Sequence, residues 1–174
     1  MKTKLLLMFL IVNLSSIYSQ KTNTTKLRST EIDTLTVAQT MFDDQNFVMA
    51  FPYLSQLQKN HPEENLFKYM TGICSLFNID TYEQGLSLLL EVYESNKKAE
   101  NIEFYIALAY NYNTNFDDAI VMVNKYLNKK HISNAQRREA EKLKMFCEEG
   151  KILTLEHDGG KLDDYIRLSL ASEE

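Results

Sequence analysis

The chain has 174 residues, a length that suits a single domain, and its formal net charge is −5. An acidic chain without a basic cluster matches a phosphate backbone poorly, which excludes nucleic-acid binding as its main function. Only two prolines and five glycines occur, and no convincing strand alternation precedes the tail. The composition therefore favours a chain built mainly from helices.

Residues 1–19 have the pattern of a secretory signal. Lys2 and Lys4 form a basic start, residues 5–14 form an apolar run, and cleavage is expected before Gln20. An uncleaved anchor is the alternative, but the run is too short to span a bilayer of about 30 Å. We therefore expect an exported protein, periplasmic or associated with the outer membrane, without a membrane span after cleavage. Loss of the two lysines changes the net charge to −7.

Residues 20–30 are polar, contain no aromatic side chain and are predicted to form a flexible leader. From residue 31 to residue 153, apolar side chains recur at spacings of three and four, which is typical of amphipathic helices. About seven helices in pairs are expected, separated by the segments DDQ, HPEEN, NIDT, SNKKAEN and NTN. Pro52 lies inside the second helix and is predicted to bend it near Val48.

Small residues recur at a fixed spacing along these helices. They are Ala38, Gly72 and Ala107 in the first helices of the pairs, and Ala50, Gly85 and Ala119 in the second helices. Successive markers are 34 or 35 residues apart in both series, so two independent markers indicate one repeat. A small residue lets the two helices of a pair approach closely. An ordinary helical bundle that happens to be periodic is the alternative.

A period near 34 residues with two helices per unit resembles the tetratricopeptide repeat. The first unit matches the family pattern at Val37-Ala38, Met41, Ala50, Leu54 and Pro62, and the third at Ile106-Ala107, Tyr110, Phe116, Ala119 and Val123. The second unit is degenerate, and the family's tryptophan is replaced by Thr34, Lys68 and Glu103. The resemblance implies an all-α fold, a right-handed α-solenoid of about three helix pairs, with units at about 31–64, 65–99 and 100–132.

A last helix at 133–152 is expected to cap this stack and to solvate its end. Ser133 or Asn134 can cap its start, and Gly150 is expected to weaken or end it. The two cysteines, Cys74 and Cys147, fall two units apart, roughly 20 Å for packed helices about 10 Å from one another. Because a disulfide needs Cα atoms within about 7 Å, we predict two free, largely buried thiols despite export.

The sequence contains no pattern that indicates an enzyme. The three histidines, at positions 61, 131 and 157, have no second ligand at metal-binding spacing, and no glycine-rich phosphate loop or nucleophile motif occurs. Paired acids such as Asp117 and Asp118 are adjacent on a helix, so their side chains diverge by about 100°. We therefore expect no catalytic residue, no metal and no cofactor.

The remaining candidate is a binding surface. In the architecture that the resemblance implies, the first helices of successive units line a concave face. This groove strip is expected to consist of Leu35, Gln39, Phe42, Tyr69, Ile73, Phe77, Phe104, Leu108, Asn111 and Tyr112. Aromatic anchors dominate peptide and helix interfaces, so the strip predicts a docking site for a protein partner. The alternative for each of these residues is a place in the core between units.

A closer resemblance concerns the segment NIEFYIALAYNYNTNFDDAIVMVNKYL and the later MFCEEGKIL. They are similar to the N-terminal region of large Bacteroidota envelope proteins that carry a β-propeller and an OmpA-like domain, some of them associated with type IX secretion. Residues 154–174 look like a shortened start of the propeller. The resemblance implies an envelope scaffold that binds another envelope protein or a peptide segment. The alternatives are a chaperone-like accessory protein for exported clients and an accessory domain of a hydrolase.

Overall fold

The computed structural model describes residues 27–156 except 79, 97 and 98. The expected signal peptide, most of the leader and the tail after residue 156 lie outside these residues. The described part contains seven α-helices and no strand, which confirms the predicted all-α class.

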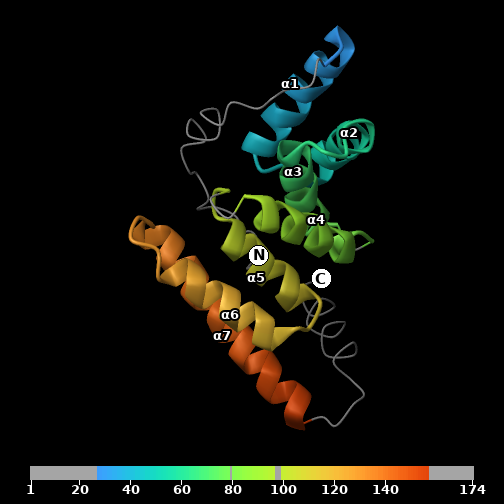
Figure 1. The fold of residues 1–174 in the computed structure, drawn as a ribbon. Coiled ribbons are helices and arrows are strands. Elements are labelled where there is room, and N and C mark those ends of the chain that lie inside the picture. The colour runs from blue at the N-terminus through green and yellow to red at the C-terminus, as the bar shows by residue number, and fades with distance from the viewer. Residues whose placement is uncertain (1–26, 79, 97–98, 157–174) are drawn as a thin grey trace.

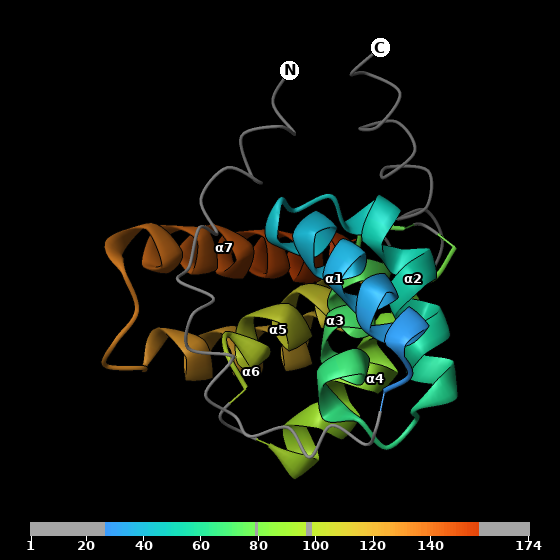
Figure 2. The ribbon, with the colours of Figure 1, turned by 90° about the horizontal axis from the view of Figure 1, so that it is seen from above.

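The helices form a stack in which consecutive helices are neighbours. Their bounds are Ser29–Asp43 (α1), Phe47–Asn60 (α2), Asn65–Ser75 (α3), Tyr82–Ser95 (α4), Ile102–Tyr112 (α5), Phe116–Leu127 (α6) and Asn134–Glu156 (α7). Each helix packs against the next one in the sequence, and α5 also contacts α7. The stack therefore runs from α1 at one end to the long α7 at the other (Figure 1), and Figure 2 shows it from above.

The turn between the helices of a pair repeats in its backbone geometry. Gln45 after α1 and Thr114 after α5 both have positive φ angles, 59° and 58°, and they stand two periods apart. The next residue donates its amide hydrogen across the turn in the same way, from Asn46 to the Met41 carbonyl and from Asn115 to the Tyr110 carbonyl. This left-handed helix end satisfies carbonyls that the helix leaves open. The first and third pairs therefore share a local structure as well as their sequence markers.

The small marker residues lie where paired helices touch. The four alanine markers are fully buried. A methyl group at Gly85 would lie 2.8 Å from the carbonyl oxygen of Gly72, and one at Gly72 would lie 2.9 Å from Cγ of Leu89. The backbones of α3 and α4 therefore meet closely at the two glycines, as the repeat interpretation predicts.

Two positions of α1 are polar where the equivalent positions of α3 are apolar. Thr36 stands one period before Met70, and Thr40 stands one period before Cys74; both later residues are buried. The two threonines are exposed and donate their hydroxyl hydrogens to the carbonyls of Ile32 and Thr36, at 2.9 and 3.0 Å. This part of α1 is therefore more polar than the equivalent part of α3, although Ile32, one turn before Thr36, and Val37 are exposed at 51% and 44%.

A buried carboxylate holds α1 to the end of α2. Glu31 accepts a hydrogen bond from the Arg28 amide at 3.0 Å and one from the Asn60 side chain at 3.2 Å. His61 Nε2 lies 3.2 Å from the same carboxylate. The Arg28 amide, assisted by the two side chains, lowers the pKa of Glu31 against the opposing effect of burial. The carboxylate therefore connects the start of α1 to the end of α2.

The start of α7 agrees with the sequence, and its end does not. Ser133 Oγ accepts the Gln136 amide hydrogen at 3.2 Å, and Gln136 Oε1 accepts that of Ser133 at 2.8 Å, so the two residues form a capping box. The helix was expected to weaken or end at Gly150, but it continues to Glu156. A methyl group at Gly150 would lie 2.6 Å from the Phe116 ring. Gly150 is therefore a packing position for α6 and not a terminator.

Helix α2 runs without interruption through Pro52. The proline side chain is exposed, and its ring nitrogen lacks the hydrogen that would bond to the Val48 carbonyl. The helix is therefore retained at the cost of one hydrogen bond, and a bend near Val48 stays a prediction.

Both cysteines are free and fully buried, which confirms the prediction for the thiols. Burial raises the pKa of Cys74 to about 12 and that of Cys147 to about 11. Cys147 also donates to Oδ1 of Asn111 at 3.3 Å, which links α7 to α5. Protonated and shielded thiols of this kind are packing groups, because the thiolate is the reactive form.

Candidate functional site

The ten residues of the groove strip differ widely in exposure. Leu35, Gln39, Phe77, Phe104 and Asn111 are half-buried, and Tyr112 is 39% exposed. The other four, Phe42, Tyr69, Ile73 and Leu108, are buried. These four side chains pack between helices in this structure, so they offer no surface to a partner. The strip therefore retains six of its ten predicted contact residues.

The rings of the strip form contacts between helices. Phe47 at the start of α2 lies 5.3 Å from Phe42, ring centre to ring centre, and stacks on Phe77 at 4.5 Å. In the next layer, Tyr69 of α3 meets Tyr105 of α5 edge-on at 6.3 Å. Aromatic pairs in these geometries stabilise a core beyond the area that they bury. The aromatic side chains that were expected to line a groove therefore contact the next helix pair.

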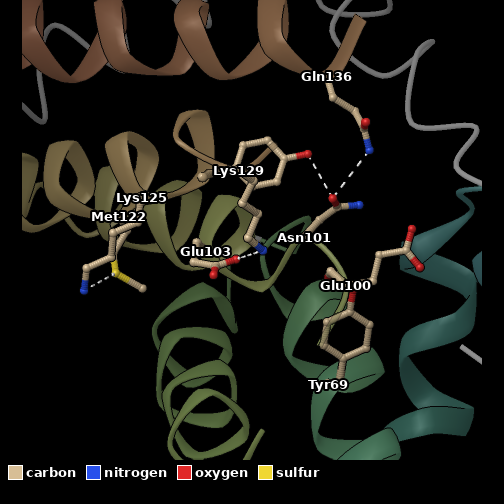
Figure 3. Close-up of polar contacts among 9 residues, drawn as sticks. Tyr69, Glu100, Asn101, Glu103, Met122, Lys125, Lys129 and Gln136 are labelled. Carbon is tan, nitrogen blue, oxygen red and sulfur yellow. Dashed lines mark hydrogen bonds and ion pairs between the residues drawn. The ribbon is translucent and has the colours of Figure 1, made fainter. Parts of the chain in front are cut away.

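A polar junction connects α3, α5, α6 and α7 around the start of α5 (Figure 3). Asn101 has a left-handed backbone, with φ at 50°, and its Oδ1 accepts hydrogen bonds from the Tyr126 hydroxyl at 2.9 Å and the Gln136 amide at 3.4 Å. Tyr69 donates its hydroxyl hydrogen to the Glu100 carbonyl at 2.6 Å. Desolvation raises the pKa of Tyr126 and of Tyr69. These phenols therefore stay protonated and act as donors that hold the junction together.

Lys68 and Glu103 stand one period apart, and each forms an ion pair. Lys68 of α3 pairs with Glu91 of α4 at 2.7 Å. One period later, the buried Glu103 of α5 pairs with Lys129, just after α6 (Figure 3). Each ion pair connects the first helix of a unit with the second helix or with a residue just after it. The first helix contributes the lysine in one unit and the glutamate in the next. An ion pair therefore links the two helices of the second pair and those of the third pair at equivalent positions.

The described residues contain no group of three or more histidine, cysteine or acidic side chains that could hold a metal ion. Near the junction, Lys125 lies 3.7 Å from the Met122 sulfur and 5.8 Å from the centre of the Tyr93 ring. Buried atoms without a hydrogen-bond partner in the described part are Thr71 Oγ1 and Glu100 Oε2. Burial raises the pKa of Glu100. The hydrogen bonds of Tyr69, Tyr126 and Gln136 connect helices at the junction, and the Glu100 carboxyl takes no part in them.

An apolar surface that the sequence reasoning missed lies on the outer side of α2. This outer patch consists of Val48, Met49, Pro52 and Tyr53, and its first two residues are 58% and 53% exposed. One period later, α4 has exposed Glu83, Gln84 and Ser87 in place of Val48, Met49 and Pro52. A further period on, α6 has Asp117, Asp118 and Val121. A comparison of the second helices position by position would have revealed the patch, because its first two positions are polar in the other units.

Two substitutions at Asn101 are expected to separate the contribution of its side-chain acceptor from that of its left-handed backbone. Asn101→Gly removes the acceptor and leaves the Tyr126 hydroxyl unpaired, which should lower the free energy of unfolding by about 1–3 kcal/mol. Asn101→Ala should lower it by about a further 1–2 kcal/mol, because alanine tolerates the left-handed conformation poorly. Urea unfolding checks both values. Tyr126→Phe in the glycine background is the control: it should restore part of the loss, and equal losses for glycine and alanine would contradict the backbone argument.

No family model, curated protein or solved structure matches the chain. No helix in the described part combines the length and apolar character needed to cross a membrane.

Proposed function

We propose that this chain is an exported, non-enzymatic repeat scaffold that binds another protein of the cell envelope, in association with secretion machinery. Its repeats are of the tetratricopeptide type and form a right-handed α-solenoid. The recurring small residues, the close contact of Gly72 with Gly85 and the helix end shared by α1 and α5 support this architecture. Stacks of this kind have extended surfaces that suit protein docking.

The outer patch on α2 is the observation that carries the binding function. Neither the core nor the repeat requires apolar residues there, since the equivalent positions of α4 begin with exposed Glu83 and Gln84. Exposed apolar residues that lie together on a surface mark interaction sites, because covering them removes apolar area from water. The docking site that we propose has therefore moved from the groove strip to the outer face of the first unit.

The patch also offers one backbone acceptor. Pro52 cannot donate to the Val48 carbonyl, so this oxygen lacks its helical hydrogen bond beside two exposed apolar side chains. A partner that places apolar side chains on the patch and an N–H or O–H group on the Val48 carbonyl would satisfy both features. An apolar segment of a protein fits this combination better than an anionic ligand, since no basic residue lies in the patch.

Transfer of the α4 residues onto α2 tests this function. The variant Val48→Glu, Met49→Gln is expected to fold normally and to lose at least about 10-fold in affinity for its partner, because apolar anchors dominate protein interfaces. Pull-downs from the envelope fraction, followed by titration of the recovered partner, measure the effect. Val121→Ser removes an apolar side chain of similar exposure from α6 and is the matched control.

The same experiment distinguishes the alternatives. One partner recovered at fixed stoichiometry supports docking, whereas several weakly bound unfolded clients would support the chaperone-like function. Tyr112→Ala tests the part of the groove strip that is still exposed. Undiminished recovery with the α2 variant and loss with Tyr112→Ala would move the docking site back to the strip.

A further inference from the structure

The sulfur atoms open to oxidation in the described part of the chain belong to methionines. Both cysteines are fully buried, and burial raises the pKa of each thiol, so they stay protonated. Oxidation of a cysteine follows its thiolate character and its exposure, and these two thiols have neither. A dissolved oxidant is therefore expected to react first with exposed thioethers.

Five methionines lie in the described residues, and two of them are exposed. Met49 belongs to the outer patch on α2, whereas Met145 lies on α7, at the other end of the stack (Figure 1). Met70 and Met122 are buried, and Met41 is half-buried. Met49 and Met145 are therefore the most accessible thioethers, and of these two only Met49 lies on the proposed docking site.

We propose that hydrogen peroxide oxidises Met49 reversibly and that its sulfoxide weakens binding at the outer patch, an effect that rests on the docking function proposed above. The thioether sulfur attacks one peroxide oxygen, and an S–O bond forms as the O–O bond breaks. The departing hydroxide takes up the proton of the transferred oxygen and leaves as water, so sulfur loses two electrons and the peroxide gains them. A methionine sulfoxide reductase reverses the step with two electrons from a dithiol, and the oxygen again leaves as water.

The sulfoxide would change the chemistry of the patch. The thioether of Met49 belongs to an apolar surface, whereas a sulfoxide oxygen is a polar hydrogen-bond acceptor. The Val48 carbonyl already lacks its helical hydrogen bond, because Pro52 has no N–H group. A partner would then cover two acceptors, and an acceptor that is buried without a donor costs free energy. Oxidation therefore removes an apolar contact and adds a polar atom that the partner must satisfy.

Peroxide treatment of the full chain, followed by mass spectrometry of its peptides, tests the chemical step. Met49 and Met145 should gain an oxygen atom about 10-fold faster than Met70 and Met122, because oxidation follows exposure. Dithiothreitol with two methionine sulfoxide reductases, one for each sulfoxide epimer, should return Met49 to the thioether. If Met49 stays reduced while Met145 is converted, Met49 is covered and the proposal is wrong.

Titration of the partner recovered from the envelope fraction tests the effect on binding, after catalase has removed the peroxide. The oxidised wild type should bind this partner about 10-fold more weakly than the untreated chain, as expected for the loss of an apolar anchor. Met49→Leu forms no sulfoxide, so its own affinity should be the same before and after peroxide. Met145→Leu is the matched control and should lose affinity on oxidation as the wild type does. A peroxide effect that persists in Met49→Leu would overturn the proposal.

Retention on a phenyl matrix separates the oxidation site from the docking function, because it reports exposed apolar surface without any partner. Peroxide should shorten the retention of Met145→Leu, in which Met49 is the remaining exposed thioether of the described part. Shorter retention with unchanged partner affinity would mean that the sulfoxide forms but does not control binding, which overturns the proposal. If the untreated chain recovers no partner although peroxide shortens its retention, the docking function fails and the oxidation site remains.

Discussion

Replacement of Gly85 by leucine is expected to lower the free energy of unfolding by about 3 kcal/mol, the upper end of the usual cost of overpacking a core. The first added atom would already lie 2.8 Å from the Gly72 carbonyl oxygen and 3.0 Å from Cβ of Ser75. A backbone oxygen and a first side-chain carbon cannot rotate away, so α3 and α4 must separate to admit the new side chain. Urea unfolding, with its linear dependence of free energy on denaturant, measures the loss.

Ser87→Leu is the control for this prediction. Ser87 lies in the same helix, is exposed and stands half a turn from Gly85, so leucine there should change stability by no more than about 0.5 kcal/mol. Equal unfolding midpoints for the leucine variants at 85 and 87 would mean that the two backbones do not meet at the glycines.

The features that could be predicted from the sequence are those that depend on spacing along the chain. Small residues at a period of 34 or 35 indicated where the paired helices touch, and the contact at Gly72 and Gly85 confirms it. The cap at Ser133 needs only its neighbour Gln136, three residues away, and it too was predictable. Buried thiols followed from the same register, since helices that stand two units apart cannot bring Cys74 to Cys147.

Gly150 illustrates what spacing cannot show. Within a helix, glycine costs roughly 1 kcal/mol relative to alanine, so local propensity indicates a weak point or an end. The structure places the Phe116 ring against this position, from a helix more than thirty residues earlier in the sequence. That contact requires the absence of a side chain, and it is visible only once α6 and α7 are packed.

Only part of the predicted groove strip is exposed in the structure, and the reason is similar. Ile73 and Tyr69 were expected to line a groove, and their periodicity is the same whether they face a groove or the next helix. In this stack Ile73 is fully buried, and the Tyr69 hydroxyl donates to the Glu100 carbonyl. Likewise, nothing near Lys68 or Glu103 in the sequence identifies Glu91 and Lys129 as their partners. Contacts between helices determine these outcomes, and the hydrophobic pattern of one helix does not encode them.

Leu89→Ala is expected to lower the free energy of unfolding by about 2–5 kcal/mol, because it removes a fully buried side chain from the contact of α3 with α4. Gly72→Ala alone should also destabilise the protein, since its new methyl group would lie 2.9 Å from Cγ and 3.1 Å from a Cδ atom of Leu89. The same leucine that fills the contact is therefore the group that excludes a side chain at position 72.

The double variant Gly72→Ala, Leu89→Ala is expected to lose at least about 1 kcal/mol less stability than the sum of its single variants, a coupling typical of residues in direct contact. The alanine methyl group at position 72 would fill part of the space that the truncated leucine leaves. Gly85→Ala with Leu89→Ala is the matched comparison, because the three atoms nearest to a methyl group at position 85 belong to Gly72, Leu76 and Ser75, whereas the nearest atom at position 72 belongs to Leu89. If the stability losses are additive for the variants at 85 and 89 but not for those at 72 and 89, the coupling comes from the contact between positions 72 and 89. Simple additivity in both pairs would mean that α3 and α4 adjust as a whole and that neither glycine is required by one particular neighbour.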